Sequence, residues 1–179
     1  MHGPLGYRSG VGIVLVNSQG LVFAGHRRDG RCPPWQMPQG GIDTSETLER
    51  AVFRELNEEL GTDRAIAADV FPGWLGYDYP ESTTTKRARC FQGQRHRWFL
   101  LKFTGSDDDI VVATEHAEFS SWRWMTPDDV VSHVIEFKQD IYRRVMAYFA
   151  PRHGLPWRDE GSVPVLPASL CPPDSLHRA

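Results

Sequence analysis

This 179-residue chain has few cysteines, no long apolar run and little net charge, and each shortage excludes a class of protein. Its cysteines, Cys32, Cys90 and Cys171, are odd in number and lack the spacing of a metal site, so we expect no disulfide framework and a reducing, cytoplasmic setting. No segment approaches the roughly 18 apolar residues of a membrane span or the apolar core of a signal peptide, so we expect no membrane partner. A net charge of −3 excludes a generally basic nucleic-acid coat, so we expect no DNA partner and only a local site for polyanions.

The most informative segment that is present covers residues 40–62 and predicts a helix over about 46–60. Residue types that favour helix N-caps occupy positions 43–45, and Gly61 is a typical C-cap signal. The glycine pair Gly40-Gly41 before the helix allows a backbone turn that brings carbonyl oxygens close to whatever the helix binds.

Three glutamates share one side of this predicted helix. With 3.6 residues per turn, Glu55, Glu58 and Glu59 fall within about 100° of one another. Like charges at these spacings cost roughly a few tenths of a kcal/mol per pair, and the helix dipole disfavours negative charge in the last turns. A solvated acidic face is one interpretation. A divalent cation bound by the three carboxylates would instead turn the repulsion into a ligand set.

The spacing within the segment resembles the Nudix box, in which a glycine, five residues, a glutamate and seven residues precede Arg-Glu-apolar-any-Glu-Glu-any-Gly-apolar. The defined places are filled in register by Gly40, Glu46, Arg54, Glu55, Leu56, Glu58, Glu59 and Gly61. Thr62 occupies the final apolar place, a departure that affects a packing contact but no ligand.

The rest of the chain predicts an α+β fold with a mixed β-sheet between helices. Strand-like runs occur at 11–16, 21–24, 74–79, 96–103 and 119–125, and residues 17–20 indicate a hairpin turn. Pro127 favours a helix start, and a last helix is expected over about 136–149. We expect residues 1–152 to form one domain and the proline-rich residues 153–179 to form a flexible extension.

Segments flanking the box resemble the Nudix branch that holds bacterial RNA 5′-pyrophosphohydrolases and diadenosine-tetraphosphate hydrolases. The similarity covers about residues 6–152 and includes Gly6-Tyr7-Arg8, Trp35-Gln36-Met37-Pro38-Gln39-Gly40-Gly41, Gly93-Gln94, Trp122-Arg123-Trp124 and Glu136-Phe137-Lys138. The resemblance implies the Nudix α/β/α sandwich and attack of water on phosphorus with two or more Mg²⁺ ions, or Mn²⁺ in their place. It implies an RNA 5′ end or a dinucleoside polyphosphate as substrate.

The resemblance also assigns roles to acidic residues. Glu118 would add a metal ligand or base, with Glu115 as its rival and a surface carboxylate as the alternative. Arg54 would pair with Glu46 and hold the carboxylates in place, unless the two form an ordinary surface ion pair. Gly40 would bring its backbone to the metal. The metal ligands in the helix, one of which could also act as general base, would be Glu55, Glu58 and Glu59.

Cationic and aromatic side chains are the candidates for substrate binding. Tyr77 and Phe137 would contact a base, with core packing as the alternative, and the cationic residues would contact phosphates. The full set is Arg8, Arg27, Arg28, Tyr77, Phe137 and Lys138. A further basic cluster suits a polyphosphate or RNA 5′ end, with charge display across strands as the alternative; it consists of Lys86, Arg87, Arg89, Arg95, Arg97 and Lys102.

Three functions are compatible with these sequence features. The leading hypothesis is a pyrophosphohydrolase that removes pyrophosphate or phosphate from triphosphorylated or diphosphorylated RNA 5′ ends. The second is hydrolysis of diadenosine tetraphosphate and its homologues. The third is a non-catalytic, nucleotide-binding regulator, against which the complete set of box glutamates argues. The oligomeric state and the identity of the general base stay open at the level of sequence.

Overall fold

A computed structural model describes residues 6–30, 34–80, 90–115 and 117–158 of the chain. The strands of this part form one sheet, with the order β3-β2-β1-β6-β5 along its main path, while β4 pairs with β1 and β7 pairs with β2. The strand β1 runs parallel to β6, and the other pairs are antiparallel. The bounds are β1 Tyr7–Val16, β2 Val22–Arg27, β3 Trp35–Gln36, β4 Gln39–Gly41, β5 Ala65–Asp78, β6 Gly93–Phe103 and β7 Phe119–Met125.

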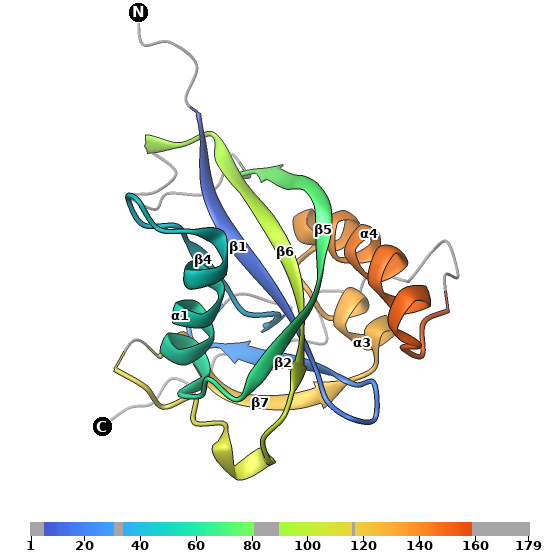
Figure 1. Cartoon of the computed structure of the whole chain (residues 1–179). Helices are drawn as coiled ribbons and strands as arrows, with labels where there is room; N and C mark the ends of the chain where they lie inside the picture. The colour runs from blue at the N-terminus through green and yellow to red at the C-terminus, as the bar shows by residue number, and fades with distance from the viewer. Residues whose placement is uncertain (1–5, 31–33, 81–89, 116, 159–179) are drawn as a thin grey trace, which may run out of the picture.

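Helices cover both faces of this mixed sheet, as the sequence predicts (Figure 1). The helix α1 (Leu48–Leu60) lies on one side, and α3 (Pro127–Ser132) and α4 (Glu136–His153) lie on the other. Side chains of β1 alternate between two buried clusters, with Val11, Ile13 and Leu15 towards α1, and Val14 and Val16 towards α4. Alternation with a period of two is what a strand covered on both faces requires. The α/β/α sandwich is therefore confirmed.

The helix α1 starts later than the sequence indicates. Thr47, rather than a residue in 43–45, is the N-cap, and its side chain accepts a backbone N–H of the first turn at 3.3 Å. The predicted C-cap is confirmed, because Gly61 has a φ of 66°. Thr62 is buried, and its hydroxyl accepts the backbone N–H of Arg64 at 3.2 Å. The polar residue at the apolar place of the box is therefore satisfied by a hydrogen bond.

Two elements extend beyond their predicted bounds. The strand β5 begins at Ala65, well before the predicted strand at 74–79. The helix α4 continues through Pro151 to His153, past the expected domain boundary at 152, and Leu155 and Trp157 pack against the core. A proline in the last turn removes a single backbone hydrogen bond, so the helix can continue through it. Residues 159–179 of the expected extension lie outside the described part.

A short 3-10 turn, η1 (Asp107–Asp109), follows β6. Within the described residues, no helix combines the length and the apolar character that a membrane crossing needs.

Candidate active site

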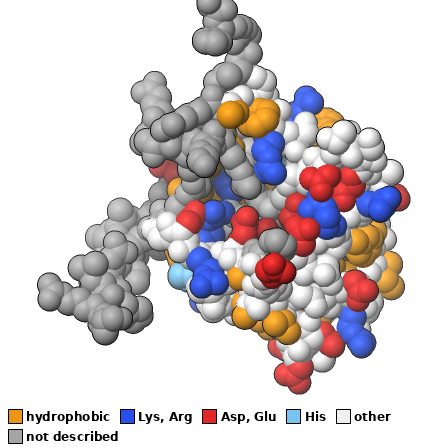
Figure 2. All heavy atoms as spheres, turned by 90° about the vertical axis from the view of Figure 1, so that its left-hand side faces the viewer, with side chains coloured by type: hydrophobic (Ala, Val, Ile, Leu, Met, Phe, Trp, Pro, Cys, Tyr) orange, Lys and Arg blue, Asp and Glu red, His pale blue; other side chains and the backbone are white. Residues whose placement is uncertain are grey.

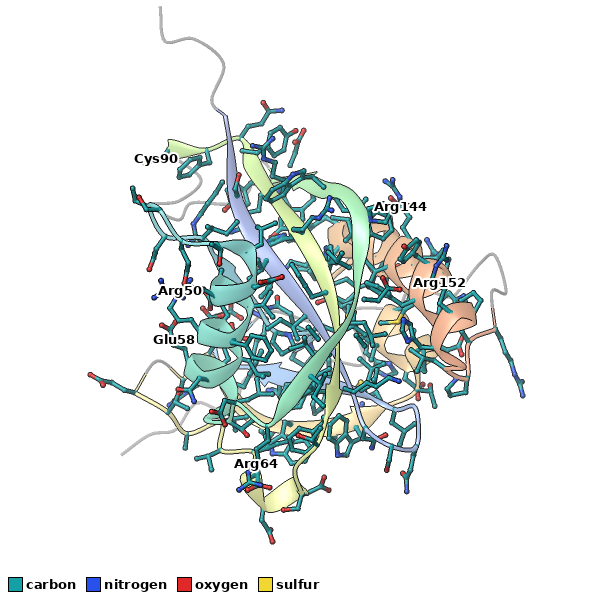
Figure 3. The ribbon with its side chains drawn as sticks, viewed as in Figure 1. Arg50, Glu58, Arg64, Cys90, Arg144 and Arg152 are labelled. Atoms are coloured by element: carbon teal, nitrogen blue, oxygen red, sulfur yellow. The ribbon has the colours of Figure 1, made fainter. Side chains whose placement is uncertain are left out.

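A cleft of about 750 Å³ lies where α1 and β4 meet β1 and the ends of β5 and β6. Figure 2 shows the side of the molecule that carries α1, where Asp and Glu side chains lie directly beside Lys and Arg. Glu58 lies on this side of α1 (Figure 3). The cleft brings together most of the predicted site residues, namely Arg8, Arg27, Gly40, Arg54, Glu55, Glu58, Tyr77, Glu118 and Lys138.

Three predicted residues do not line this cleft. Glu59 is buried at 2% exposure, one turn after Glu55. Arg28 is exposed, and its backbone N–H donates to the carbonyl of Glu118 at 3.1 Å, so its contribution here is to the position of Glu118. Phe137 is half-buried and packs against Tyr77, a residue of the cleft, with a ring-centroid distance of 5.1 Å.

Arg54 is the centre of the acidic side of the cleft. Its Nε and Nη2 donate to the two carboxylate oxygens of Glu46 at 2.9 and 2.8 Å. Its Nη1 donates to Glu55 at 2.8 Å and to Glu58 at 3.2 Å, and Nη2 also donates to the carbonyl of Gly41 at 2.7 Å. The expected pairing with Glu46 is present. One planar guanidinium thus holds three carboxylates and the glycine turn in a fixed arrangement.

The pKa values on this side follow from the contacts. The guanidinium of Arg54 lowers the pKa of Glu46 to about 2, against the opposing effect of burial. Glu46 is the main cause of the raised pKa of Arg54, to which Glu55 also contributes. The pKa of Glu55 is raised because burial outweighs its hydrogen bond with Arg54. Glu46 and Arg54 are therefore a stable ion pair, while Glu55 is a carboxylate held in a poorly solvated place.

The glycine pair before α1 is required by two close approaches. A Cβ on Gly40 would overlap the carboxyl group of Glu55, and a Cβ on Gly41 would overlap the guanidinium of Arg8. The antiparallel pairing of β4 with β1, through Val11 and Gly40, fixes the backbone on which these side chains rest. The glycines therefore serve close packing of charged groups against backbone, a role that the sequence assigns to them only in part.

Glu59 carries the most unusual carboxyl group of the site. Burial raises its pKa well above the ordinary range, and the charges of Glu118 and Glu55 add to this effect. The backbone N–H of Gln39 donates a hydrogen bond to the Glu59 carboxyl. The Oε2 atom of Glu59, however, is buried and has no hydrogen-bond partner among the described residues. A buried acceptor without a donor is costly. A cation at this place would satisfy it.

The metal-ligand atoms that α1 can offer suit hard divalent cations. Glu55, Glu58 and Glu59 all supply carboxylate oxygens, which are the ligands that such cations prefer. In the described part of the chain, no three acidic, His or Cys side chains are already gathered into a cation site. Instead, Nη1 of Arg54 donates to both Glu55 and Glu58, which keeps these two carboxylates around the guanidinium.

A cationic wall of the cleft is organised by a glutamine. Gln36 is 2% exposed, and its Oε1 accepts from Nη1 of Arg27 at 2.6 Å and from Nζ of Lys138. Lys138 also donates to Gln39 at 3.2 Å. Arg27 is held on its other side by two oxygens of Asp29, which is the main reason, against burial, for its raised pKa. Two cations therefore share one buried acceptor.

Aromatic and amide groups form the end of the cleft near β5 and β6. The hydroxyl of Tyr77 donates to Oε1 of Gln94 at 3.0 Å, and Nε2 of Gln94 donates to the hydroxyl of Tyr79 at 2.7 Å. The ammonium of Lys138 lies 5.4 Å from the centre of the Tyr77 ring. The side chain of Arg8 reaches the same cleft from β1. This end offers both an aromatic surface and amide groups to a ligand.

Glu118 is favoured over Glu115 by position. It lies immediately before β7 and lines the cleft, and its charge is felt by Glu55 and Glu59. Glu115 is exposed and does not line the cleft.

Several lining residues were missed by sequence reasoning. They carry common polar or aromatic types, and local sequence distinguishes only four of them. Gln36, Gln39 and Gln94 fall within the segments that flank the box, and Asp43 falls within the box segment. The missed residues are Asp29, Gln36, Gln39, Asp43, Tyr79 and Gln94.

The NUDIX domain matches residues 6–149. An RNA pyrophosphohydrolase of Rhodospirillum rubrum is 48% identical over 150 residues, covering 82% of this chain and 88% of the relative. An RNA pyrophosphohydrolase of Cereibacter sphaeroides is 44% identical over 152 residues, covering 83% of this chain and 94% of the relative.

Solved structures show the same fold at lower identity. The E. coli dihydroneopterin triphosphate pyrophosphohydrolase has a TM-score of 0.62 at 17% identity, covering 80% of this chain and 99% of its own. A C. elegans Ap4A hydrolase binary complex has a TM-score of 0.56 at 17% identity, covering 79% of this chain and 98% of its own. The matched domain spans most of the sequence, and Gly40, Arg54, Glu55 and Glu58 of the box line one cleft of the expected fold. The chain belongs to the NUDIX domain family.

Proposed function

We propose that this chain is a metal-dependent RNA pyrophosphohydrolase, which removes pyrophosphate or phosphate from the 5′ end of triphosphorylated or diphosphorylated RNA. The observation that carries the proposal is the identity of 44–48% to RNA pyrophosphohydrolases over most of both chains. The site supports it, because both carboxylates and cationic side chains line a single cleft. A cleft of this kind suits a polyphosphate with a nucleotide attached.

The carboxylate wall would hold the metal. Members of the family generally use divalent metal ions. We propose that two or more Mg²⁺ ions, or Mn²⁺ in their place, bind to the carboxylates of Glu55, Glu58, Glu59 and Glu118. The backbone of Gly40 would lie next to the metal. Bound there, such ions would neutralise phosphate charge and acidify the attacking water.

The chain's own groups have separate roles around that centre. Arg54 positions Glu55 and Glu58 through its Nη1 and is itself anchored by Glu46. Glu118 and Glu58 are the candidates for the general base, because each lines the cleft without being deeply buried. Their partial exposure would let them take a proton from water and pass it to solvent.

The cationic wall would bind the phosphates. Arg8 lines the cleft, and its guanidinium has no hydrogen bond or ion pair within the described part of the chain, so a phosphate oxygen is a suitable acceptor. Lys138 and Arg27, which both donate to Oε1 of Gln36, would supply further phosphate contacts. Tyr77, backed by Phe137, would contact a base at the end of the cleft. Arg28 is exposed and does not line the cleft, so it would contact only a part of the substrate that extends beyond the cleft.

The alternative, hydrolysis of diadenosine tetraphosphate, has less support. The likeness to the C. elegans Ap4A hydrolase, at 17% identity, shows the fold alone. A regulator without catalysis is disfavoured, because Glu55, Glu58 and Arg54 of the box line one cleft. We place the activity in the cytoplasm, where RNA substrates and reduced thiols coexist.

One experiment separates these functions. Triphosphorylated RNA and diadenosine tetraphosphate are incubated side by side with the enzyme and Mg²⁺, and the products are identified. We expect pyrophosphate or phosphate and 5′-monophosphorylated RNA, with far slower release of nucleotides from diadenosine tetraphosphate. Faster hydrolysis of diadenosine tetraphosphate would mean that it, and not RNA, is the substrate. Hydrolysis of neither compound would favour a non-catalytic regulator.

A further inference from the structure

Three neighbouring strands carry a second group of aromatic and cationic side chains outside the cleft. Arg8, Gln94 and Tyr77 are in register across β1, β6 and β5, and all three line the cleft. The next residues in register include Ser9 on β1 and Arg95 on β6. Because successive side chains of a strand point to opposite faces, this second group lies on the face away from Arg8, Gln94 and Tyr77.

The contacts within this group are specific. The guanidinium of Arg95 lies over the ring of Trp74, 5.1 Å from its centre, and its Nε donates to the hydroxyl of Ser9 at 3.0 Å. Trp74 is 41% exposed and Tyr7 39% exposed, which is unusual for side chains of this size. We call Tyr7, Ser9, Trp74, Arg95 and Arg97 the arginine–tryptophan face.

Arg97 supplies an independent sign that this face takes an anion. It is in register with Val11 and Trp74, and its Nε is buried with no hydrogen-bond partner in the part of the chain that the structure describes. A buried guanidinium N–H without an acceptor is costly, and a phosphate oxygen is an acceptor of matching geometry. Of the basic cluster expected from the sequence, Arg95 and Arg97 face away from the cleft, while Lys86, Arg87 and Arg89 lie outside the described residues.

The arginine–tryptophan face is left uncovered by the described helices. The helix α1 packs over β1 and β4, while β5 is at the opposite edge of the sheet (Figure 1). The core cluster on the α1 side reaches Val70 and Phe99, and the arginine–tryptophan face lies beyond them towards the strand ends at Tyr7 and Asp78. The carboxylate of Asp78 is already engaged by the hydroxyl of Tyr7 and by Gln92.

We propose that the arginine–tryptophan face binds the nucleotides of RNA that follow those held in the cleft. Exposed aromatic rings interleaved with cations bind single-stranded nucleic acid, through base stacking and phosphate contacts. In this arrangement a base stacks on Trp74, and phosphates contact Arg95 and Arg97. The strand β1 begins at Tyr7, next to Arg8, so an RNA strand that leaves the cleft would round this strand end past the exposed Tyr7 to reach this face. The inference rests on the proposed RNA substrate and adds that the enzyme prefers longer chains.

The test compares two substrate lengths. The value of kcat/KM is measured for 5′-triphosphorylated RNAs of about two and about eight nucleotides, a length within the site sizes of single-strand binders. The variants are Trp74→Ala, Arg95→Gln and the double variant Arg95→Gln/Arg97→Gln. Lys102→Gln is the matched control, because Lys102 is exposed on β6 but lies in register with Val16, far from the cleft end.

We expect the wild-type enzyme to prefer the longer RNA. Each variant should lower kcat/KM on the longer RNA by about tenfold, the loss of one stacked base or phosphate contact, and leave the short RNA within about twofold. The double variant should also reduce the salt dependence on the longer RNA by about two units of slope. Thermal melts show whether each variant is folded, and Arg95→Gln, at an exposed position, decides the matter if Trp74→Ala unfolds.

Two failures can be told apart. Full activity of every folded variant on the longer RNA, or equal losses on both lengths, would overturn the inference while the proposed function stands. No turnover of either RNA by the wild-type enzyme would overturn the proposed function itself.

Discussion

The backbone of Gly40 and the carboxyl group of Glu55 lie so close together that any side chain at position 40 would occupy the space of the carboxyl. The contact joins β4, which is anchored to β1, to the middle of α1. On its other side, the Glu55 carboxylate accepts a hydrogen bond from Arg54. Glu55 is therefore held between a strand and a guanidinium, in the position that the proposed chemistry requires.

Gly40→Ala tests this contact. The added methyl group must displace Glu55, and we expect kcat to fall by about 100-fold, as misplacement of a reacting group by about 1 Å can do. Gly6→Ala is the control, because a Cβ at Gly6 would meet nothing within 4 Å. Steady-state rates and thermal melts on the same samples are the measurements. A folded Gly40→Ala enzyme with a normal rate would show that Glu55 does not need this position.

Arg54→Lys tests the role of the guanidinium. Lysine keeps the charge but cannot donate to Glu46, Glu55, Glu58 and the Gly41 carbonyl at once. We expect kcat to fall by about 10–100-fold, in line with the loss of a group that orients metal ligands. The affinity for Mg²⁺, followed by calorimetry, should fall with it. A variant with unchanged kcat and Mg²⁺ affinity would reduce Arg54 to an ordinary surface cation.

Lys138→Met tests the cationic wall. Methionine keeps much of the volume of the buried side chain but removes its charge, so we expect a higher KM, a nearly unchanged kcat and a salt dependence that falls by about one unit of slope. Lys102→Met, at an exposed position on β6, should leave all three unchanged. If KM and its salt dependence match the wild type, Lys138 serves packing and not phosphate binding.

The buried His96 predicts a loss of stability in mild acid. Burial lowers its pKa to about 3, and the charges of Lys138 and Arg8 act in the same direction. An unfolded histidine has a pKa of about 6.5, so below that pH the unfolded state takes up a proton that the folded state does not. The contribution of neutral His96 to the free energy of unfolding is at its full value above about pH 6.5. It falls by up to about 1.4 kcal/mol for each pH unit between that pH and about pH 3.

Urea unfolding at about pH 7 and about pH 5 measures the effect. The wild-type protein should lose about 2 kcal/mol more between these values than His96→Gln, which has no titrating ring. Equal losses in the two proteins would mean that His96 is protonated in the folded state.

Much of the fold could be predicted because its signals are local. The alternation of apolar residues in 11–16 and the spacing of the box glutamates need only a short stretch of sequence. The start of α1 was predicted too early, because three residues of N-cap type stand ahead of Thr47, and Ser45 adopts a positive φ of 68° that no helix start has. The continuation of α4 through Pro151 depends on packing that the local pattern does not show.

The cationic wall and the arginine–tryptophan face could not be derived in the same way. The pairing of β1 with β6 brings Arg8 beside Gln94, and Gln36 meets Lys138 across 102 positions. Strand alternation then places Arg95 and Arg97 on the face away from the cleft, which their local sequence does not show. Burial of Glu59 likewise depends on how tightly β4 packs against α1.

The central claim is that the carboxylates of α1 bind the metal that makes hydrolysis possible. It is tested most directly by the rate of pyrophosphate release from triphosphorylated RNA over a Mg²⁺ titration, for wild type, Glu58→Gln and the control Glu49→Gln, which alters an exposed residue of the same helix outside the cleft. We predict a Mg²⁺-dependent rate for wild type and Glu49→Gln, abolished by a chelator, and almost no rate for a folded Glu58→Gln at any Mg²⁺ concentration. Strong turnover in metal-free buffer, or a folded Glu58→Gln enzyme with the wild-type Mg²⁺ dependence, would contradict the account.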